Sequence, residues 1–159
     1  MTLDHIYSRF EKSLLWAWIS NKRLIFDNSC VIIQSRKGNN MYTVEFYEDK
    51  NGVSEVRDYF MKLTKEAETD KNARINKNKI FSYVRALEEY GTRIGSPIVK
   101  HIDGNLWELR PLSNRIFFFY WKDNKFVLIH YYIKKSQKAP KKEIKKAMSN
   151  IKDWLERNG

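Results

Sequence analysis

The stretch 106–133 constrains the fold of this chain more than any other part, because three runs of strand-forming residues follow one another with only short turns between them. The runs cover residues 106–110, 115–121 and 125–133. The turns between them are rich in Pro, Ser, Asn and Asp, the residues that favour β-turns. Strands joined by such short turns pair with antiparallel neighbours. The sequence therefore predicts a three-strand antiparallel meander.

Helices and one further strand are expected around this meander. Residues 41–47 alternate like a strand. Two segments with helical spacing follow, the second ending near Gly91, and a third begins at Pro140. The order strand, two helices, three-strand meander and C-terminal helix predicts an α+β fold: a small, mainly antiparallel sheet with helices against one face. The apolar positions of the three helical patterns are Val53, Val56, Phe60 and Leu63, then Ile75, Ile80, Val84 and Leu87, and finally Ile144, Ala147, Met148, Ile151, Trp154 and Leu155.

Residues 1–40 are expected to stand apart from a domain that spans residues 41–159. Residues 3–19 have helical spacing, and residues 23–33 have the pattern of a hairpin. These patterns favour a helix-hairpin extension with a regulatory role. The alternative is a leader in front of a start at Met41, since codons for residues 37–40 could form a ribosome-binding site. Both alternatives leave 41–159 as the working unit.

The charge balance points to a polyanionic partner. The chain holds 30 Lys and Arg residues against 19 Asp and Glu residues, a net charge of +11. Such an excess attracts nucleic acid or an acidic protein. The single cysteine, Cys30, excludes an internal disulfide, and the apolar run 14–19 is too short to cross a bilayer. We expect a cytoplasmic protein without a membrane-spanning segment.

The sequence patterns of metal and cofactor sites are missing. There is no Cys/His set with zinc spacing and no glycine-rich loop that could cradle phosphates, and the histidines are His5, His101 and His130. We therefore expect chemistry that uses neither a metal nor an organic cofactor.

Cationic side chains stand at the strand ends of the predicted meander. Alternation places Glu108 and Arg110 on the same face of the first strand, and Arg115 opens the second strand just across the turn. Lys134 and Lys135 close the third strand, which returns to the same edge. Both arginines are expected at an open sheet edge. Convergent Arg and Lys side chains suit a phosphodiester and the extra negative charge of its transition state. The alternative is that Glu108 pairs with an arginine while the lysines of 134–142 form a solvated face.

The histidine and the aromatic residues of the meander are expected to serve the core. In the run 117–121, alternation puts Phe117, Phe119 and Trp121 on one face and Phe118 and Tyr120 on the other. His130 lies mid-strand, in phase with Leu128 and Tyr132, where a packed or hydrogen-bonded structural role fits better than a catalytic one.

Two motifs resemble the HigB branch of the RelE/ParE toxin superfamily. The first is Leu-Trp-Glu-Leu-Arg at 106–110, followed by Arg115 and an aromatic-rich strand. The second is Leu-Ile-His-Tyr-Tyr-Ile-Lys-Lys-Ser-Gln-Lys-Ala-Pro at 128–140, and the residues 142–147 continue it. The resemblance covers about residues 41–157 and implies a RelE-like fold.

This resemblance implies the toxin of a type II toxin-antitoxin system, an endoribonuclease that cleaves mRNA on the ribosome without a metal. The ribose 2′-OH would attack the adjacent phosphate. Arg110 and Arg115 would hold that phosphate, and Lys135, with Lys134, would supply a further catalytic cation. The implied partners are mRNA, the ribosome and a small helix-turn-helix antitoxin of the HigA type. Basic residues expected to contact RNA are Lys100, His101, Lys138, Lys141 and Lys142.

Two other functions stay open at the level of sequence. The main rival is a ParE-like toxin, which would share the fold, inhibit DNA gyrase and cleave nothing. Another is a degenerate protein that binds an antitoxin and RNA without turnover. The retained Arg110, Arg115 and Lys134/Lys135 favour the nuclease, because an inhibitor does not need clustered phosphate binders.

Overall fold

A computed structural model describes residues 42–137 and 139–159 and contains one five-stranded sheet. The expectations for residues 1–40 therefore lie outside the described residues. Along the sheet the strands follow the order β1-β5-β4-β3-β2. The β3–β4–β5 meander is antiparallel, as predicted, and β1 joins it parallel to β5. The strands are β1 (Thr43–Phe46), β2 (Val99–Asp103), β3 (Leu106–Leu109), β4 (Asn114–Trp121) and β5 (Lys125–Ile133).

The fifth strand, β2, is absent from the expectation based on sequence. It pairs antiparallel to β3 and forms the edge of the sheet opposite β1. Its register shifts between His101 and Asp103. Because of this irregularity and its mostly exposed side chains, β2 does not show the alternation by which the other strands are recognised.

Three helices accompany the sheet: α2 (Glu55–Glu66), α3 (Lys71–Tyr90) and α4 (Lys141–Asn158). The Ser54 hydroxyl and the Asp70 carboxylate cap α2 and α3, each accepting from a backbone N–H three residues later. The helix α3 ends at Gly91, whose φ of 62° suits glycine, and the short helix η1 (Gly91–Ile94) follows. None of the described helices is both long enough and apolar enough to span a membrane.

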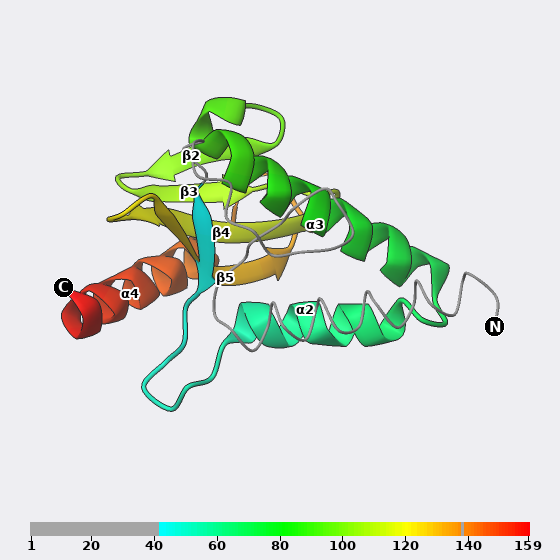
Figure 1. Ribbon diagram of the computed structural model, residues 1–159, viewed down its shortest axis with the longest axis horizontal. Helices are drawn as coiled ribbons and strands as arrows, with labels where there is room; N and C mark the ends of the chain where they lie inside the picture. The colour runs from blue at the N-terminus through cyan, green and yellow to red at the C-terminus, as the bar shows by residue number, and fades with distance from the viewer. Residues whose placement is uncertain (1–41, 138) are drawn as a thin grey trace, which may run out of the picture.

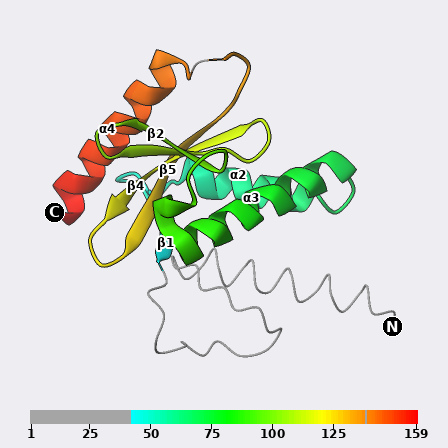
Figure 2. The same ribbon diagram turned by 90° about the horizontal axis from the view of Figure 1, so that it is seen from above.

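The helices cover both faces of the sheet, which corrects the expectation of helices against one face. Figures 1 and 2 show α2 and α3 on one side of the sheet and α4 on the other. The cause is visible in β4: Phe118 packs into the core beneath α2 and α3, whereas Phe117 and Phe119 pack into the core beneath α4. A strand with large apolar residues on both sides must be covered on both sides. The α+β class and the predicted alternation of these phenylalanines are confirmed.

A register shift in β5 overturns the predicted phase of His130. Phe117 pairs with His130 while Phe118 pairs with Leu128, so β5 carries one extra residue at this point. Leu128 therefore belongs to the core beneath α2 and α3, whereas Tyr132 packs against the core beneath α4. Because of this bulge, the side chains in the last part of β5 point to the opposite faces from those that unbroken alternation would give.

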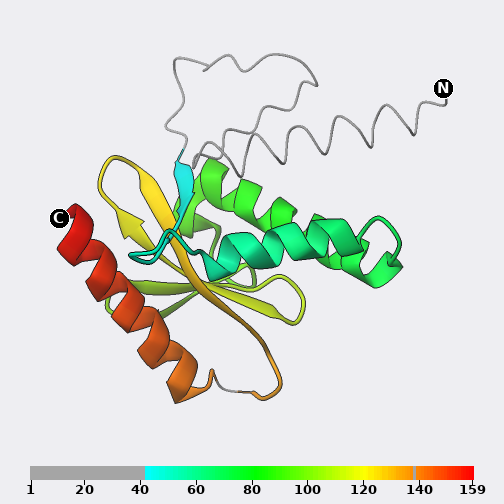
Figure 3. The ribbon, with the colours of Figure 1, turned by 90° about the horizontal axis from the view of Figure 1, so that it is seen from below.

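The helix α4 buries only part of its predicted apolar stripe. Ala147 and Ile151 are buried, whereas Met148 and Leu155 remain exposed. Further along, the Asn150 side chain donates to the Ile129 carbonyl, and Tyr47 donates to Asp153 at 2.8 Å. As Figure 3 shows, the chain leaves β5, makes a wide connection and returns along the sheet as α4.

Candidate active site

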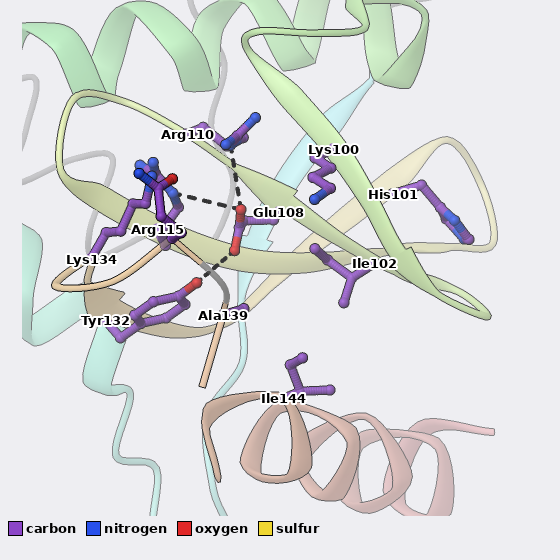
Figure 4. A pocket seen from close by; sticks show the side chains of 11 residues that line it. Lys100, His101, Ile102, Glu108, Arg110, Arg115, Tyr132, Lys134, Ala139 and Ile144 are labelled. Carbon is purple, nitrogen blue, oxygen red and sulfur yellow. Dashed lines mark hydrogen bonds and ion pairs between the residues drawn. The ribbon is translucent and has the colours of Figure 1, made fainter. Parts of the chain in front are cut away.

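A pocket of about 260 Å³ lies between the α4 side of the sheet, the β5–α4 connection and the first turn of α4 (Figure 4). Strands β2 to β5 and the start of α4 all contribute to it, so residues distant in sequence meet there. Its lining residues are Lys100, His101, Ile102, Glu108, Arg110, Arg115, Tyr132, Lys134, Gln137, Ala139 and Ile144.

The carboxylate of Glu108 organises the cationic part of this pocket. Glu108 is only 4% exposed, and its Oε1 lies 3.5 Å from Arg110 Nε and 3.6 Å from Arg115 Nε. Its Oε2 accepts a hydrogen bond of 2.8 Å from the hydroxyl of Tyr132. One buried carboxylate thus pairs with both arginines, which goes beyond the single pairing considered as an alternative from the sequence (Figure 4).

The two arginines differ in how firmly they are held. Arg115 is buried, and its Nη1 donates to the carbonyls of Leu112 at 2.8 Å and Asn114 at 2.6 Å. The expectation that Arg115 lies at an open edge is therefore wrong, because the turn before β4 wraps its guanidinium. The side chain of Arg110 is 27% exposed, and its buried Nε has no hydrogen-bond partner among the described residues. Arg110 is the better placed of the two to take up an external acceptor.

Lys100 and His101 contribute to the pocket from the edge strand. Lys100 is exposed and pairs in register with Glu108 of β3. The His101 ring nitrogen Nε2 lies 2.8 Å from the Gly104 carbonyl, and the ring packs edge-on against Trp107 at 4.9 Å. Figure 4 shows Lys100 close to Glu108 and His101 further out along the rim.

The predicted lysines separate into one that lines the pocket and others that do not. The backbone N–H of Lys134 donates to the Ser113 carbonyl at 2.8 Å, which brings the end of β5 beside the β3–β4 turn. Lys134 lines the pocket, whereas Lys135 is exposed and does not. Lys141 and Lys142 are exposed in the first turn of α4, also outside the lining. Lys138 lies outside the described residues.

Tyr132 and the α4 wall are pocket features that the sequence did not single out. Burial, together with the hydrogen bond to the Glu108 carboxylate, raises the pKa of Tyr132. Tyr132 therefore stays a neutral hydroxyl that fixes one carboxylate oxygen. The signal that could have found it is the cross-strand pairing of Arg115 with Tyr132, which depends on the bulge in β5. Ile144 of α4 and Ala139 just before this helix form an apolar wall of the pocket (Figure 4).

The electrostatic character of the pocket is that of an anion site. Four cationic side chains, Lys100, Arg110, Arg115 and Lys134, surround the single carboxylate of Glu108. A negatively charged oxygen would complete the partly paired arginine donors. In the part of the chain that the structure describes, no group of three or more His, Cys, Asp and Glu side chains is arranged to hold a metal ion.

Comparison with known families identifies one match. The family model described as phage derived protein Gp49-like (DUF891) matches residues 58–152, which is more than half of the chain and includes the whole pocket. No curated protein matches the chain.

Proposed function

Since the chain belongs to the phage-derived Gp49-like family, we propose that it is a HigB-type toxin of a type II toxin-antitoxin system. In this proposal it is an endoribonuclease that cuts mRNA engaged by ribosomes in the cytoplasm. It uses protein side chains, without a metal ion, to promote attack by the ribose 2′-OH on the adjacent phosphate. The resemblance of 106–115 and 128–140 to HigB motifs supports the same assignment.

The observation that carries this proposal is the meeting of Arg110, Arg115 and Lys134 in one pocket, around a buried carboxylate. Arg115 lies in β4, whereas Arg110 and Lys134 directly follow β3 and β5. All three are among the catalytic residues that the sequence resemblance implies, the fourth being Lys135. A merely solvated basic face would not need a buried Glu108 to hold two guanidinium groups side by side. The buried Nε of Arg110, which makes no hydrogen bond within the described part of the chain, adds a donor that a phosphate oxygen would satisfy.

The proposed reaction assigns a role to each group. The 2′-oxygen bonds to phosphorus and loses its proton, while the bond to the 5′-oxygen breaks and that oxygen takes up a proton. The products are a 2′,3′-cyclic phosphate and a 5′-OH end. Arg110 and Arg115 stabilise the negative charge that grows on the phosphate oxygens. Lys134 supplies the further cation, and Lys100 and His101 bind the RNA backbone at the rim.

The proposal also implies two kinds of partner. The net charge of +11 favours binding next to ribosomal RNA, where the toxin would reach its mRNA. A cell that makes such a nuclease needs an inhibitor, which we expect to be a small helix-turn-helix antitoxin of the HigA type. Co-purification should recover it in stoichiometric amount, and a toxin isolated from its own cell without such a partner would contradict this part of the proposal.

The decisive experiment maps RNA ends made by the full chain in a cell-free translation reaction. We expect new 5′-OH ends within the reading frame when ribosomes engage the mRNA, and none on the same mRNA without ribosomes. Arg110→Ala should reduce them by roughly a hundredfold. Lys145→Ala is the matched control, because Lys145 is an exposed cation of α4 outside the pocket and should leave cleavage unchanged.

The rival function predicts a different result in the same cells. A gyrase inhibitor of the ParE kind would leave transcripts intact and block DNA supercoiling. If induction of the wild-type chain leaves mRNA intact and plasmid DNA relaxed, the protein would be a gyrase inhibitor and not a nuclease. Intact mRNA with normal supercoiling would leave only binding without turnover.

A further inference from the structure

A second cluster of titratable side chains lies near the pocket, next to the core ring Phe117, which also contacts the pocket residue Tyr132. At its centre is His130 of β5, which is only 4% exposed. Its Nδ1 lies 3.0 Å from the Glu55 carboxylate at the start of α2, and its Nε2 lies 2.5 Å from the Glu143 carboxylate in the first turn of α4. Lys146 of α4 also contacts Glu55. One buried ring thus connects both helical layers through the sheet.

The chemistry of the ring decides its charge in this arrangement. A neutral imidazole has one N–H donor and one lone pair, so it can donate to only one of two carboxylates. The lone pair would then face the oxygen of the other. Only the imidazolium form has two donors and matches both Glu55 and Glu143. The contact from β5 to both helices is therefore complete when His130 carries its second proton.

The Glu143 contact lies where α4 meets the pocket. Pro140 occupies the cap position of α4, and no side chain of the described residues caps this N-terminus. Glu143 is followed directly by Ile144, which lines the pocket with Ala139. Its attachment to β5 fixes the turn that carries this wall. On the strand, Phe117 lies 6.4 Å from the His130 ring and 5.5 Å from the ring of Tyr132.

We propose that His130 is a positioning residue for the pocket: its imidazolium draws the first turn of α4 onto the sheet through Glu143 and so sets the wall against which RNA is held. The effect on RNA rests on the proposed nuclease function, whereas the attachment of α4 does not. His130 itself does not line the pocket. Its action on the reaction passes through Glu143 and the turn that follows it.

The surroundings of His130 give the direction of the pH dependence. The groups that face it are Glu55 from α2, Glu143 and Lys146 from α4, Phe117 from β4 and the neighbouring ring of Tyr131 in β5. Burial opposes the charge of Glu55, but hydrogen bonds from Lys146 and His130 hold the pKa of this carboxyl below its ordinary value. A ring without its second proton would turn a lone pair toward one of these carboxylates, so higher pH can only weaken one of the two contacts.

Two substitutions of Glu143 test the proposal. In Glu143→Gln a neutral imidazole can donate to Glu55 and accept from the new amide, so the attachment no longer requires the imidazolium. We compare kcat for mRNA cleavage by Glu143→Gln with kcat for the wild type at each pH. The ratio of the variant's kcat to the wild-type kcat should rise by about tenfold with pH, which corresponds to the loss of one charge-assisted hydrogen bond in the wild type. Glu143→Ala should cleave poorly at every pH. Any pH dependence of the ribosome or of the catalytic groups is common to both proteins and cancels in this ratio.

Amide hydrogen exchange of the free protein supplies a readout that does not need cleavage. The amides of residues 141–146 should lose protection with rising pH in the wild type more than in Glu143→Gln. Asp153→Asn is the matched control, because it makes the same change on α4 far from the pocket, where Asp153 accepts from Tyr47. The kcat and the amide protection of Asp153→Asn, each divided by the wild-type value, should not change with pH.

The outcomes separate the two proposals. The exchange pattern without any cleavage by the wild type would overturn the nuclease and leave the His130 attachment standing. Cleavage with a flat Glu143→Gln ratio, or a fully active Glu143→Ala, would overturn the positioning role and leave the nuclease standing.

Discussion

Glu108 is the residue on which the candidate site depends, although it is the one anion in a cationic pocket. It spaces Arg110 and Arg115 by binding both at one oxygen, and Tyr132 fixes its other oxygen. Without this carboxylate the two guanidinium groups would repel each other at close range. The arrangement leaves Arg110 with more exposure than Arg115, so substitutions of the two residues should have different consequences.

Replacing each arginine by alanine should separate catalysis from stability. Arg110→Ala should reduce mRNA cleavage by roughly a hundredfold, as for a lost transition-state donor, with little change in the free energy of unfolding. Arg115→Ala should reduce cleavage and also destabilise the fold by about 1–3 kcal/mol, because two backbone carbonyls lose their buried donor. Urea unfolding and end mapping measure the two effects, and equal stability loss in both variants would refute this distinction.

The buried carboxyl of Glu88 should make the protein less stable at alkaline pH. Burial raises its pKa from 4.5 to about 9, against the opposing effect of Arg85, and neither side-chain oxygen has a hydrogen-bond partner among the described residues. A folded-state pKa above the unfolded value means that stability is complete below pH 4.5 and falls as the pH rises toward 9. Glu88→Gln should remove this loss and stabilise the fold at pH 7 by about 3 kcal/mol.

The measurement for Glu88→Gln is the urea midpoint of both proteins across this pH range. The two curves should meet at the acid end and separate as the pH rises. A difference that is the same at every pH would show that the effect comes from packing and not from the charge of Glu88.

At the scale of elements, the sequence predicts what alternation and helical spacing encode, and no more. The meander 106–133 is correctly predicted because its apolar residues sit at regular positions. The strand β2 is missed because its pattern is irregular and only Val99 in it is buried. Alternation also cannot reveal the extra residue in β5, which changes the face of every later residue in that strand.

The same limit explains which site residues were found. Arg110, Arg115 and Lys134 follow from short turns, which place strand ends side by side. Tyr132 and Ile144 reach the pocket only through the bulge and through the docking of α4, and both depend on tertiary packing. Whether helices cover one face of the sheet or both likewise depends on tertiary packing, because β4 has apolar side chains on both faces that must be covered.

The helix pair on the far side of the sheet should affect stability without affecting the pocket. Asp70 caps α3 by accepting from the Ala73 N–H at 2.6 Å, and no pocket residue belongs to α2 or α3. Asp70→Ala should lower the free energy of unfolding by about 1 kcal/mol and leave cleavage unchanged. Lys71→Ala, an exposed neighbour, is the control that should change neither. Loss of cleavage in the folded Asp70→Ala protein would mean that the two faces are coupled.

At the scale of the whole molecule, we predict that a chain starting at Met41 folds, arrests growth and cleaves like the full chain. It keeps β1, in which Val44 and Phe46 are buried, and every residue that lines the pocket. A chain starting at Asp49 lacks β1 and should lose soluble yield, because the parallel pairing with β5 and two core residues disappear. Aggregation or loss of toxicity in the Met41 form would show that residues 1–40 belong to the working domain.

The position of β2 at the rim of the pocket has a consequence for how the protein behaves at high concentration. An edge strand exposes unpaired backbone groups that invite a second chain to add to the sheet, and charged side chains and irregular register discourage it. In β2 these deterrents are Lys100, Asp103 and the register shift before Asp103. Beyond any effect on the proposed RNA binding, Lys100→Val should therefore cause self-association, which light scattering should detect and which Lys100→Gln should avoid. A variant changed at this strand would remain soluble only if the replacement is polar.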